Sequence, residues 1–339
     1  MTTISVSPFA HEFSCENGET LLEAALRNGV LLKYGCKHGG CGTCKVRLLD
    51  GDVTDRGSTF ALSMEDQAND LILACASVPL EPCMIDVEPS GLTEEEFFSG
   101  DTSRGYDAVV ETVDVLTADI ARVRLDLSDE MDFTAGQFVN VEVPGTGLLR
   151  TFSMANAPDH PSVVELICKL YPDGLFSKFL REAVPGATVR LFGPYGTLKV
   201  HLSHRPILMI AGGSGMAPLL SMLRDLAVRG SDRPVALYFG ARSEADLYAL
   251  DDIAEIGQTL CNFEFIPVLS HSWSANWSGE TGMVTEAIAR RCPTLAHDVY
   301  LCGPPPMIDA AVPLLLERGV RPRNIYYDAF TPAAQVVSV

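Results

Sequence analysis

The stretch Gly35–Cys44, which reads GCKHGGCGTC, decides how the first third of this chain folds. It places Cys36, Cys41 and Cys44 within nine residues, and a fourth cysteine, Cys75, follows in the short sequence LACA. A chain whose thiols stay reduced uses clustered cysteines to bind metal rather than to form disulfides. The stretch therefore predicts a metal centre held by a small domain at the N-terminus.

The spacing C-x4-C-x2-C with a distant fourth cysteine resembles that of plant-type [2Fe–2S] ferredoxins. The resemblance implies a β-grasp-like ferredoxin domain over residues 1–95, with Cys36, Cys41, Cys44 and Cys75 as the cluster ligands. A zinc site is the alternative, but zinc knuckles favour two C-x2-C pairs and only Cys41–Cys44 has that spacing here. Local patterns fit a small α+β domain, because Thr20 and Glu23 form a capping box at the start of a predicted helix, Thr20–Arg27.

The remaining chain divides by its patterns. An acidic stretch with little periodicity predicts a linker, which we place at 96–105. Residues 106–203 carry short β-type segments separated by turn signals, which predict an antiparallel barrel with one short helix at Phe176–Glu182. Residues 204–339 alternate apolar strands with helical stretches, which predicts βαβ units around a parallel sheet. The expected fold is therefore multidomain, α+β followed by α/β.

Two short motifs in the barrel region indicate a flavin site. Arg150–Ser153 reads RTFS and Gly174–Ser177 reads GLFS. Their order resembles the R-x-[YF]-S and G-x-x-S motifs of the ferredoxin–NADP reductase superfamily, and Gly193–Gly196 (GPYG) follows where that family has G-P-x-G. The resemblance implies that Arg150 binds the FAD pyrophosphate, that Thr151 and Phe152 lie at the cofactor, and that Ser153 hydrogen-bonds near flavin N5. It also implies that the amides of Gly174–Ser177 face phosphate. Lys169 is expected to add positive charge there.

A glycine-rich turn indicates the nicotinamide site. The strand Ile207–Ala211 runs into GGSGMAP at Gly212–Pro218, and a helix is predicted over Leu219–Arg229. A helix N-terminus after such a turn can hold a diphosphate. The residues expected to bind the dinucleotide are Gly212, Gly213, Ser214 and Gly215, which resemble the superfamily motif G-G-[ST]-G-x-A-P.

Three later segments complete this resemblance. Arg242 follows a strand where the adenosine ribose is expected, and Cys302–Met307 reads CGPPPM, which implies that Cys302, Gly303 and Pro304 flank the nicotinamide. Phe330 stands where the family has an aromatic residue against the flavin. The candidate catalytic residues are Ser153, Cys302 and Phe330. Arg242 would suit the 2′-phosphate of NADPH, but nearby acidic residues oppose it, so we expect NADH, with NADPH as the alternative.

The net charge of the chain indicates which classes of partner it can bind. The chain has 44 acidic against 25 basic residues, a net charge of −19, which disfavours nucleic acid and anionic membranes. Residues 1–100 hold 16 acidic and 6 basic residues, so the first domain suits a partner with a basic patch. The first residues lack the pattern of a signal peptide, and we expect a cytoplasmic protein.

The order of the three domains resembles the reductase components of bacterial multicomponent oxygenases, of the phenol hydroxylase and benzoate dioxygenase type. The resemblance implies an oxidoreductase in which NADH gives a hydride to FAD and a [2Fe–2S] cluster passes single electrons on. The acceptor would be an oxygenase component or a small ferredoxin. Two alternatives stay open: the same cofactors feeding a deoxysugar dehydratase, and a zinc-bearing scaffold that binds nucleotides without turnover.

Overall fold

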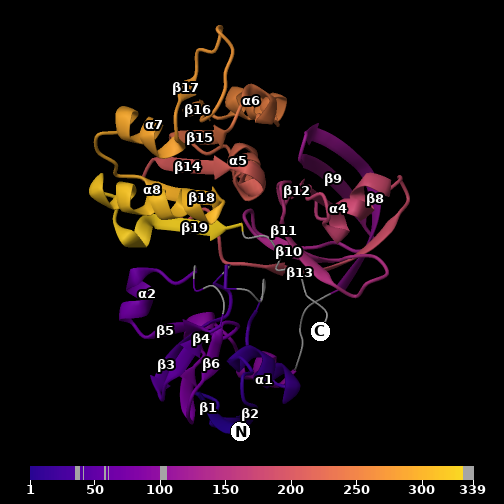
Figure 1. The fold of residues 1–339 in the computed structure, drawn as a ribbon, viewed down its shortest axis with the longest axis vertical. Coiled ribbons are helices and arrows are strands. Elements are labelled where there is room, and N and C mark those ends of the chain that lie inside the picture. The colour runs from indigo at the N-terminus through magenta and orange to yellow at the C-terminus, as the bar shows by residue number, and fades with distance from the viewer. Residues whose placement is uncertain (35–38, 41, 57–58, 60, 100–104, 331–339) are drawn as a thin grey trace. The chain divides into compact units, whose positions relative to one another are not determined.

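The computed structural model describes residues 1–34, 39–40, 42–56, 59, 61–99 and 105–330. The chain forms two compact units (Figure 1). The first is Met1–Arg104 with Tyr195–Thr197, and the second is Gly105–Pro194 with Leu198–Val339. The second unit contains two different sheets, so the barrel and the parallel α/β domain predicted from the sequence form one body.

The first unit is built on a five-stranded mixed sheet of order β2-β1-β7-β3-β5. Its strands are β1 (Thr2–Ser7), β2 (His11–Cys15), β3 (Lys45–Asp50), β5 (Leu71–Leu73) and β7 (Cys83–Asp86), with a separate pair, β4 (Val53–Asp55) and β6 (Ser77–Pro79). Its helices are α1 (Leu21–Arg27), α2 (Met64–Ala68) and α3 (Glu94–Ser99), with a 3₁₀ turn, η1 (Glu88–Ser90). Parallel pairing of β1 with β7 between antiparallel neighbours is consistent with the predicted β-grasp-like domain.

The predicted first helix is confirmed, including the way it starts. The Thr20 hydroxyl accepts from the Glu23 N–H, and the Thr20 N–H donates to the Glu23 carboxylate at 2.9 Å. The capping box satisfies two backbone donors that the helix itself leaves free. The apolar side of the helix, Leu21, Leu22, Ala24 and Ala25, is buried in the core of this unit.

The linker predicted over 96–105 begins too early. Helix α3 covers Glu94–Ser99, and Phe97 is fully buried in the core of the first unit. The Thr93 hydroxyl accepts from the Glu96 N–H, and the Thr93 N–H donates to the Glu96 carboxylate. This second capping box was present in the sequence, but the surrounding acidic residues suggested a linker instead. Residues 100–104 lie outside the described part of the chain.

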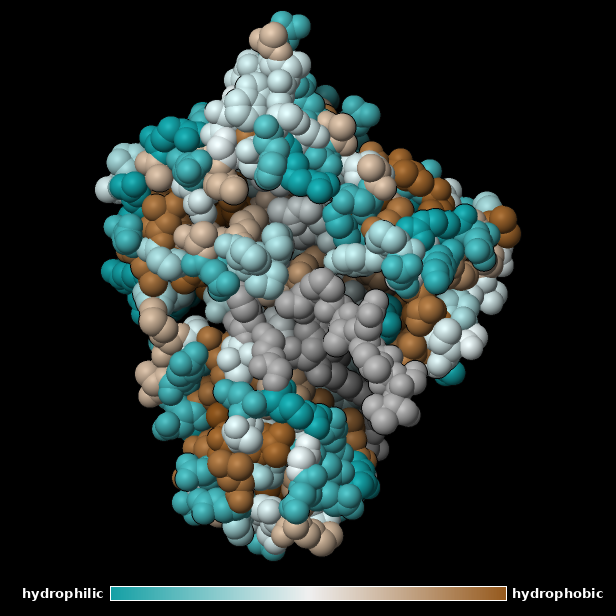
Figure 2. Space-filling model, viewed as in Figure 1, coloured by the Kyte–Doolittle hydropathy of each residue, from teal (hydrophilic) through white to brown (hydrophobic). Residues whose placement is uncertain are grey.

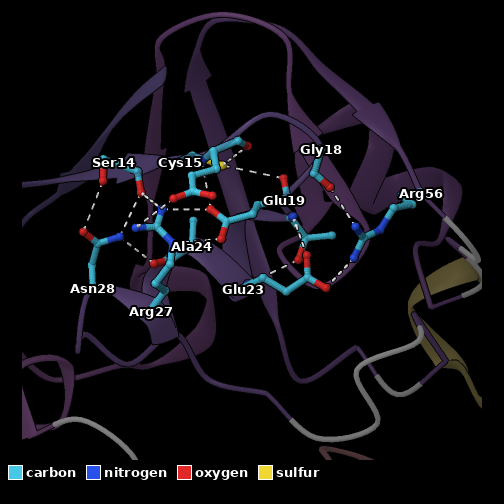
Figure 3. A network of polar contacts seen from close by, with 11 residues as sticks. Ser14, Cys15, Gly18, Glu19, Glu23, Ala24, Arg27, Asn28 and Arg56 are labelled. Carbon is cyan, nitrogen blue, oxygen red and sulfur yellow. Dashed lines mark hydrogen bonds and ion pairs between the residues drawn. The ribbon is translucent and has the colours of Figure 1, made fainter. Parts of the chain in front are cut away.

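A polar network holds the second strand to the first helix (Figure 3). The Arg27 guanidinium donates to both oxygens of Glu19, at 2.8 and 2.9 Å, and to the Ser14 carbonyl at 2.8 Å. The Glu19 carboxylate also accepts from the Glu16 N–H. These hydrogen bonds, first from Arg27 and then from Glu16, lower the pKa of Glu19 to about 2.

The lowered pKa predicts how acid affects this unit. A carboxylate with an unfolded pKa of about 4.3 and a lower folded pKa stabilises the fold above pH 5, and the contribution disappears as the pH falls towards the folded value. After discounting for solvent screening, we expect Glu19→Gln to lower the melting temperature by about 2–4 °C at pH 7. Calorimetry should show that difference shrinking between pH 5 and pH 3. Glu16→Gln, whose carboxylate lies 4.0 Å from Arg27, should have a smaller effect. A difference for Glu19→Gln that stays constant from pH 7 to pH 3 would contradict the assignment.

The first half of the second unit is an antiparallel barrel, as predicted. Its sheet has the order β11-β10-β13-β8-β9-β12. The strands are β8 (Gly105–Thr117), β9 (Ile120–Leu127), β10 (Phe138–Glu142), β11 (Leu149–Ser153), β12 (Val163–Lys169) and β13 (Thr188–Tyr195), with helix α4 (Leu175–Glu182). An antiparallel bridge between Met154 and Leu166 joins the chain just after β11 to β12, so the two edges of the sheet meet.

The second half is a six-stranded parallel sheet of order β17-β16-β15-β14-β18-β19. The strands are β14 (Ile207–Gly212), β15 (Val235–Ala241), β16 (Phe263–Leu269), β17 (Glu280–Thr281), β18 (Asp298–Gly303) and β19 (Ile325–Ala329). Helices α5 (Met216–Val228) and α6 (Leu250–Thr259) lie on one side of the sheet, and α7 (Val284–Arg291) and α8 (Pro305–Glu317) on the other (Figure 1). The strand order reverses at β14, and α/β sheets bind ligands at the carboxyl ends of the strands at such a point.

Three hydrophobic cores support this architecture. One lies in the first unit, one inside the barrel, and one under the parallel sheet. On the surface, hydrophilic residues are spread widely between smaller hydrophobic patches (Figure 2). Among the described residues, no helix has the length and apolar character needed to cross a membrane.

Candidate electron-transfer sites

Two of the four predicted cluster ligands lie in the described part of the chain. The Cys44 and Cys75 sulfur atoms are 3.2 Å apart and both side chains are buried. A disulfide would bring the sulfurs to about 2.05 Å, so no disulfide joins these two cysteines. Strand β3 begins after Cys44, and Cys75 follows β5, held where the Ala74 N–H donates to the Cys44 carbonyl at 3.0 Å. Soft sulfur donors brought together in this way fit an iron–sulfur cluster. Cys36 and Cys41 lie outside the described residues.

The flavin motif RTFS forms strand β11, next to β10. The Thr151 hydroxyl donates to the Asn140 side chain at 2.7 Å, which fixes the middle of the strand. Ser153 is buried, and its hydroxyl makes no hydrogen bond to any described residue. Arg150 donates only to the neighbouring Leu149 carbonyl and has no carboxylate partner within the described ranges. An unpaired guanidinium and a free hydroxyl on one strand suit an anionic, hydrogen-bonding cofactor.

The second flavin motif is brought against the first. The rings of Phe152 and Phe176 lie 4.8 Å apart, so β11 and the start of α4 are in contact. Gly174 is the N-cap of α4 and provides no side-chain cap, which leaves the first amides of the helix available to phosphate. The Ser177 hydroxyl accepts from the Tyr171 N–H at 2.9 Å, and a methyl group on Gly174 would lie 2.8 Å from the Ser177 hydroxyl oxygen. Ser177 therefore shapes the turn, and a larger residue at 174 would displace its hydroxyl.

Lys169 forms an ion pair within the second unit. Its ammonium pairs with Asp119, and Asp119 also accepts from Arg242 at 3.3 Å. The positive charge expected at the flavin phosphates is thus offset by a carboxylate, and the role of Lys169 at the flavin stays a prediction.

The glycine turn expected to bind the dinucleotide lies at the carboxyl end of β14, where it forms a 3₁₀ turn, η2 (Gly213–Gly215), before α5 begins. A methyl group on Gly215 would lie 2.1 Å from the Cys302 carbonyl oxygen, so only glycine fits there. Met216 starts the helix three residues earlier than the sequence predicted. The buried Tyr248 hydroxyl donates to the Gly213 carbonyl at 2.8 Å, and this hydrogen bond holds the turn in place.

The nicotinamide motif CGPPPM lies beside this turn. Cys302 pairs in register with Ala211 of β14 and is fully buried. Burial, and then the negative charge of Asp328, raise the pKa of the Cys302 thiol well above its ordinary value, so the group stays protonated. The Phe330 N–H donates to the Gly303 carbonyl at 2.8 Å, which brings the C-terminal aromatic residue to the same place. The structure therefore brings the two predicted nucleotide segments, the glycine turn and CGPPPM, together with Phe330 at one edge of the sheet.

The charge on Arg242 is balanced. Its guanidinium donates to Asp246 at 3.1 Å and to Asp119 at 3.3 Å, although the side chain is mostly exposed. Asp246 also accepts from the N–H and hydroxyl of Ser243. Two carboxylates at this arginine oppose the 2′-phosphate of NADPH, which agrees with the expectation of NADH.

This pairing leads to a prediction about nucleotide choice. Asp119→Asn removes the carboxylate that Arg242 and Lys169 share, and should raise kcat/KM for NADPH by about fivefold, because partly exposed charge pairs contribute on the order of 1 kcal/mol. The kcat/KM for NADH should change by less than about threefold, since its ribose carries no phosphate at that position. Steady-state kinetics with both nucleotides measures the two values. An unchanged ratio between them would contradict the role of Asp119.

Comparison with known proteins identifies the chain. Family models match a 2Fe-2S iron-sulfur cluster binding domain at residues 4–80, an oxidoreductase FAD-binding domain at 107–200 and an oxidoreductase NAD-binding domain at 209–312. The propane 2-monooxygenase reductase component of Gordonia sp. (strain TY-5) is 38% identical over an alignment of 340 positions, which covers 98% of this chain and 97% of that protein. The chain belongs to the family of oxygenase reductase components.

Other relatives support the same family. The phenol 2-monooxygenase reductase component DmpP of Pseudomonas sp. (strain CF600) is 35% identical, over 98% of the reductase described here and 95% of its own length. The crystal structure of the Amycolatopsis cytochrome P450 reductase GcoB superimposes with a TM-score of 0.74 at 35% identity, covering 98% of this reductase and 99% of that chain. The predicted cofactors, FAD, a [2Fe–2S] cluster and NADH, are confirmed, and the zinc-bearing scaffold is set aside.

Sequence reasoning missed several residues that shape these sites. Tyr248 fixes the glycine turn, Asp119 balances Arg242, and Arg224 contacts the chain just beyond Ser153. Each contact joins residues 35 or more positions apart, and no local sequence motif predicts it. Only the assembled fold reveals them.

Proposed function

We propose that this reductase delivers electrons from NADH to a monooxygenase that acts on a small apolar organic molecule, and that it works in the cytoplasm. The observation that carries the proposal is the near full-length similarity to reductase components whose named systems oxidise propane and phenol. Cys44 and Cys75 lie 3.2 Å apart without forming a disulfide, which supports a reducing compartment where thiols stay available for a cluster.

The protein's residues would divide the work. Arg150 and the first amides of α4 would bind the FAD diphosphate, and the Ser153 hydroxyl would donate to the ring edge. The Gly213–Gly215 turn would hold the NADH diphosphate, and the neutral Cys302 thiol would line the nicotinamide without competing as a nucleophile.

Bound FAD would supply the change from two-electron to one-electron transfer, which the side chains cannot perform. The flavin accepts two electrons as a hydride and releases them singly. Cys44 and Cys75, with Cys36 and Cys41, would hold the cluster that passes each electron on. The acidic first domain would meet a basic surface on the partner, because opposite charge speeds encounter.

Reconstitution tests the partner. The purified reductase, NADH and the oxygenase component encoded beside it should convert a small alkane or phenol, and product should appear in proportion to the NADH consumed. Omitting the reductase should stop turnover. If NADH reduces the flavin and cytochrome c but the oxygenase receives no electrons, the partner assignment is wrong although the electron-transfer chain is intact.

A further inference from the structure

Within the second unit, one helix connects the two cofactor sites. Helix α5 starts at the glycine turn of the nucleotide site and packs along the barrel. Its Met222 lies so close to Gly136 of the barrel that a methyl group on Gly136 would be 2.4 Å from the Met222 side chain. The barrel residues Ile120, Ala155 and Ile167 belong to the same hydrophobic core as α5. The apolar interface therefore resists separation, but apolar contact has no direction and does not by itself prevent sliding.

Two side chains of α5 add direction to this contact. The fully buried Ser221 hydroxyl donates to the Asn156 carbonyl at 2.7 Å, and Arg224 donates to the Ala155 carbonyl at 2.9 Å. Ala155 and Asn156 follow Ser153, the residue expected at the flavin edge, by two and three positions. The helix that begins at the nucleotide turn is thus hydrogen-bonded to the backbone that continues from the flavin strand.

A ring of four charges surrounds these bonds. Arg224 donates to Glu165 of β12 at 2.8 Å and to Asp252 of α6 at 2.5 Å. Arg122 of β9 donates to Asp252 at 2.5 Å and lies 3.7 Å from Glu165. The ring alternates in sign and takes two members from the barrel and two from the parallel sheet's helices. All four side chains are at most 22% exposed.

Buried ion pairs are weak evidence for stability, because apolar residues of similar size often serve as well. Hydrogen bonds of fixed direction, in contrast, set the position of one surface on another. Hydride transfer needs the donor carbon of the nicotinamide within about 3–3.5 Å of the acceptor nitrogen of the flavin. A displacement of about 1 Å can lower the rate 100-fold. We propose that Arg224 is a positioning residue, which with Ser221 and the charge ring sets the nucleotide-binding helix against the flavin strand for hydride transfer.

This inference rests on the proposed binding of FAD and NADH. The test is anaerobic stopped-flow reduction of the holoprotein at saturating NADH. Arg224→Gln should lower the rate constant of flavin reduction by about 10–100-fold, while the Kd for NADH changes by less than about threefold. The long-wavelength charge-transfer absorption of the nucleotide on the flavin should weaken in parallel. A merely structural role would not move that band selectively.

Arg229→Gln is the matched control. Arg229 lies on the same helix and pairs with Asp225 four residues earlier, so its ion pair does not reach the barrel. Its substitution should leave the rate and the band unchanged. The double variant Glu165→Gln, Arg224→Gln should reduce its flavin no more slowly than the slower of the two single variants. The reason is that both substitutions remove the same contact, the one between Arg224 and Glu165.

If Arg224→Gln does not fold, Ser221→Ala carries the test, since it removes one hydroxyl of the same interface and should slow the reaction by about 3–10-fold with the same loss of the band. Native-like rates in the variants that fold, or an equal effect of Arg229→Gln, would overturn the inference. Failure of the native protein to be reduced by NADH would instead overturn the proposed function.

Discussion

Replacing Cys75 by serine is expected to abolish electron delivery to one-electron protein acceptors. Cys75 is buried against Cys44, and a serine oxygen is a poor donor to iron compared with a thiolate. With NADH as the donor, cytochrome c reduction should fall by about 1000-fold, which corresponds to about 4 kcal/mol. Reduction of ferricyanide, a small acceptor that can take electrons from the flavin, should stay within about threefold of native.

Cys83 provides the matched control for Cys75. It is buried in the same unit, but its thiol donates to the Asp52 and Glu81 carbonyls, and it is not one of the four predicted ligands. Cys83→Ala should keep the iron, the visible absorption of the cluster and the cytochrome c activity. Retention of a full cluster in Cys75→Ser, or its loss in Cys83→Ala alone, would contradict the ligand assignment.

Gly215→Ala is expected to have the second largest effect, on the nucleotide site. The added methyl group would lie 2.1 Å from the Cys302 carbonyl oxygen and 2.5 Å from the Gly303 nitrogen, so the turn and the CGPPPM segment must move apart. Both segments are expected to contact the nucleotide. We expect kcat/KM for NADH with ferricyanide to fall by at least about 100-fold. Dithionite should still reduce the flavin and cluster, because neither site contains Gly215.

Gly257→Ala is the control for this change. Gly257 lies inside α6, where a methyl group would meet only the Phe263 ring at 3.2 Å, and alanine favours the helix by about 1 kcal/mol. Its kcat/KM should stay within about threefold of native. A Gly215→Ala variant that uses NADH equally well would show that this turn does not hold the nucleotide.

The parts of this fold that depend on local pattern were predictable. The capping box at Thr20, the alternating strands of the barrel and the apolar strand before Gly212 each lie within a few residues, and the structure has them where expected. The cysteine spacing belongs to the same class of signal. One local signal was overlooked, because Thr93 and Glu96 form a capping box inside an acidic stretch whose helix buries Phe97.

The parts that depend on distant pairing were not predictable. Lys169 ends a barrel strand and pairs with Asp119, 50 positions away, and nothing in the sequence near either residue indicates the pair. Arg224 reads as an ordinary surface residue of a helix, yet the fold places it in a ring with residues of β9, β12 and α6. A single sequence contains no local cue to such partners, since propensity and periodicity describe only neighbours along the chain.

The central claim is that electrons pass from NADH through the flavin to the cluster of one polypeptide. Anaerobic titration of the purified protein with NADH, followed by absorbance and low-temperature EPR, tests it most directly. We expect bleaching of the flavin and a rhombic EPR signal from a reduced [2Fe–2S] cluster, both complete after about 1.5 equivalents of NADH, because each NADH supplies two electrons, the flavin takes two and the cluster takes one. A protein whose flavin bleaches without any iron signal, although Cys36, Cys41, Cys44 and Cys75 are intact, would contradict it.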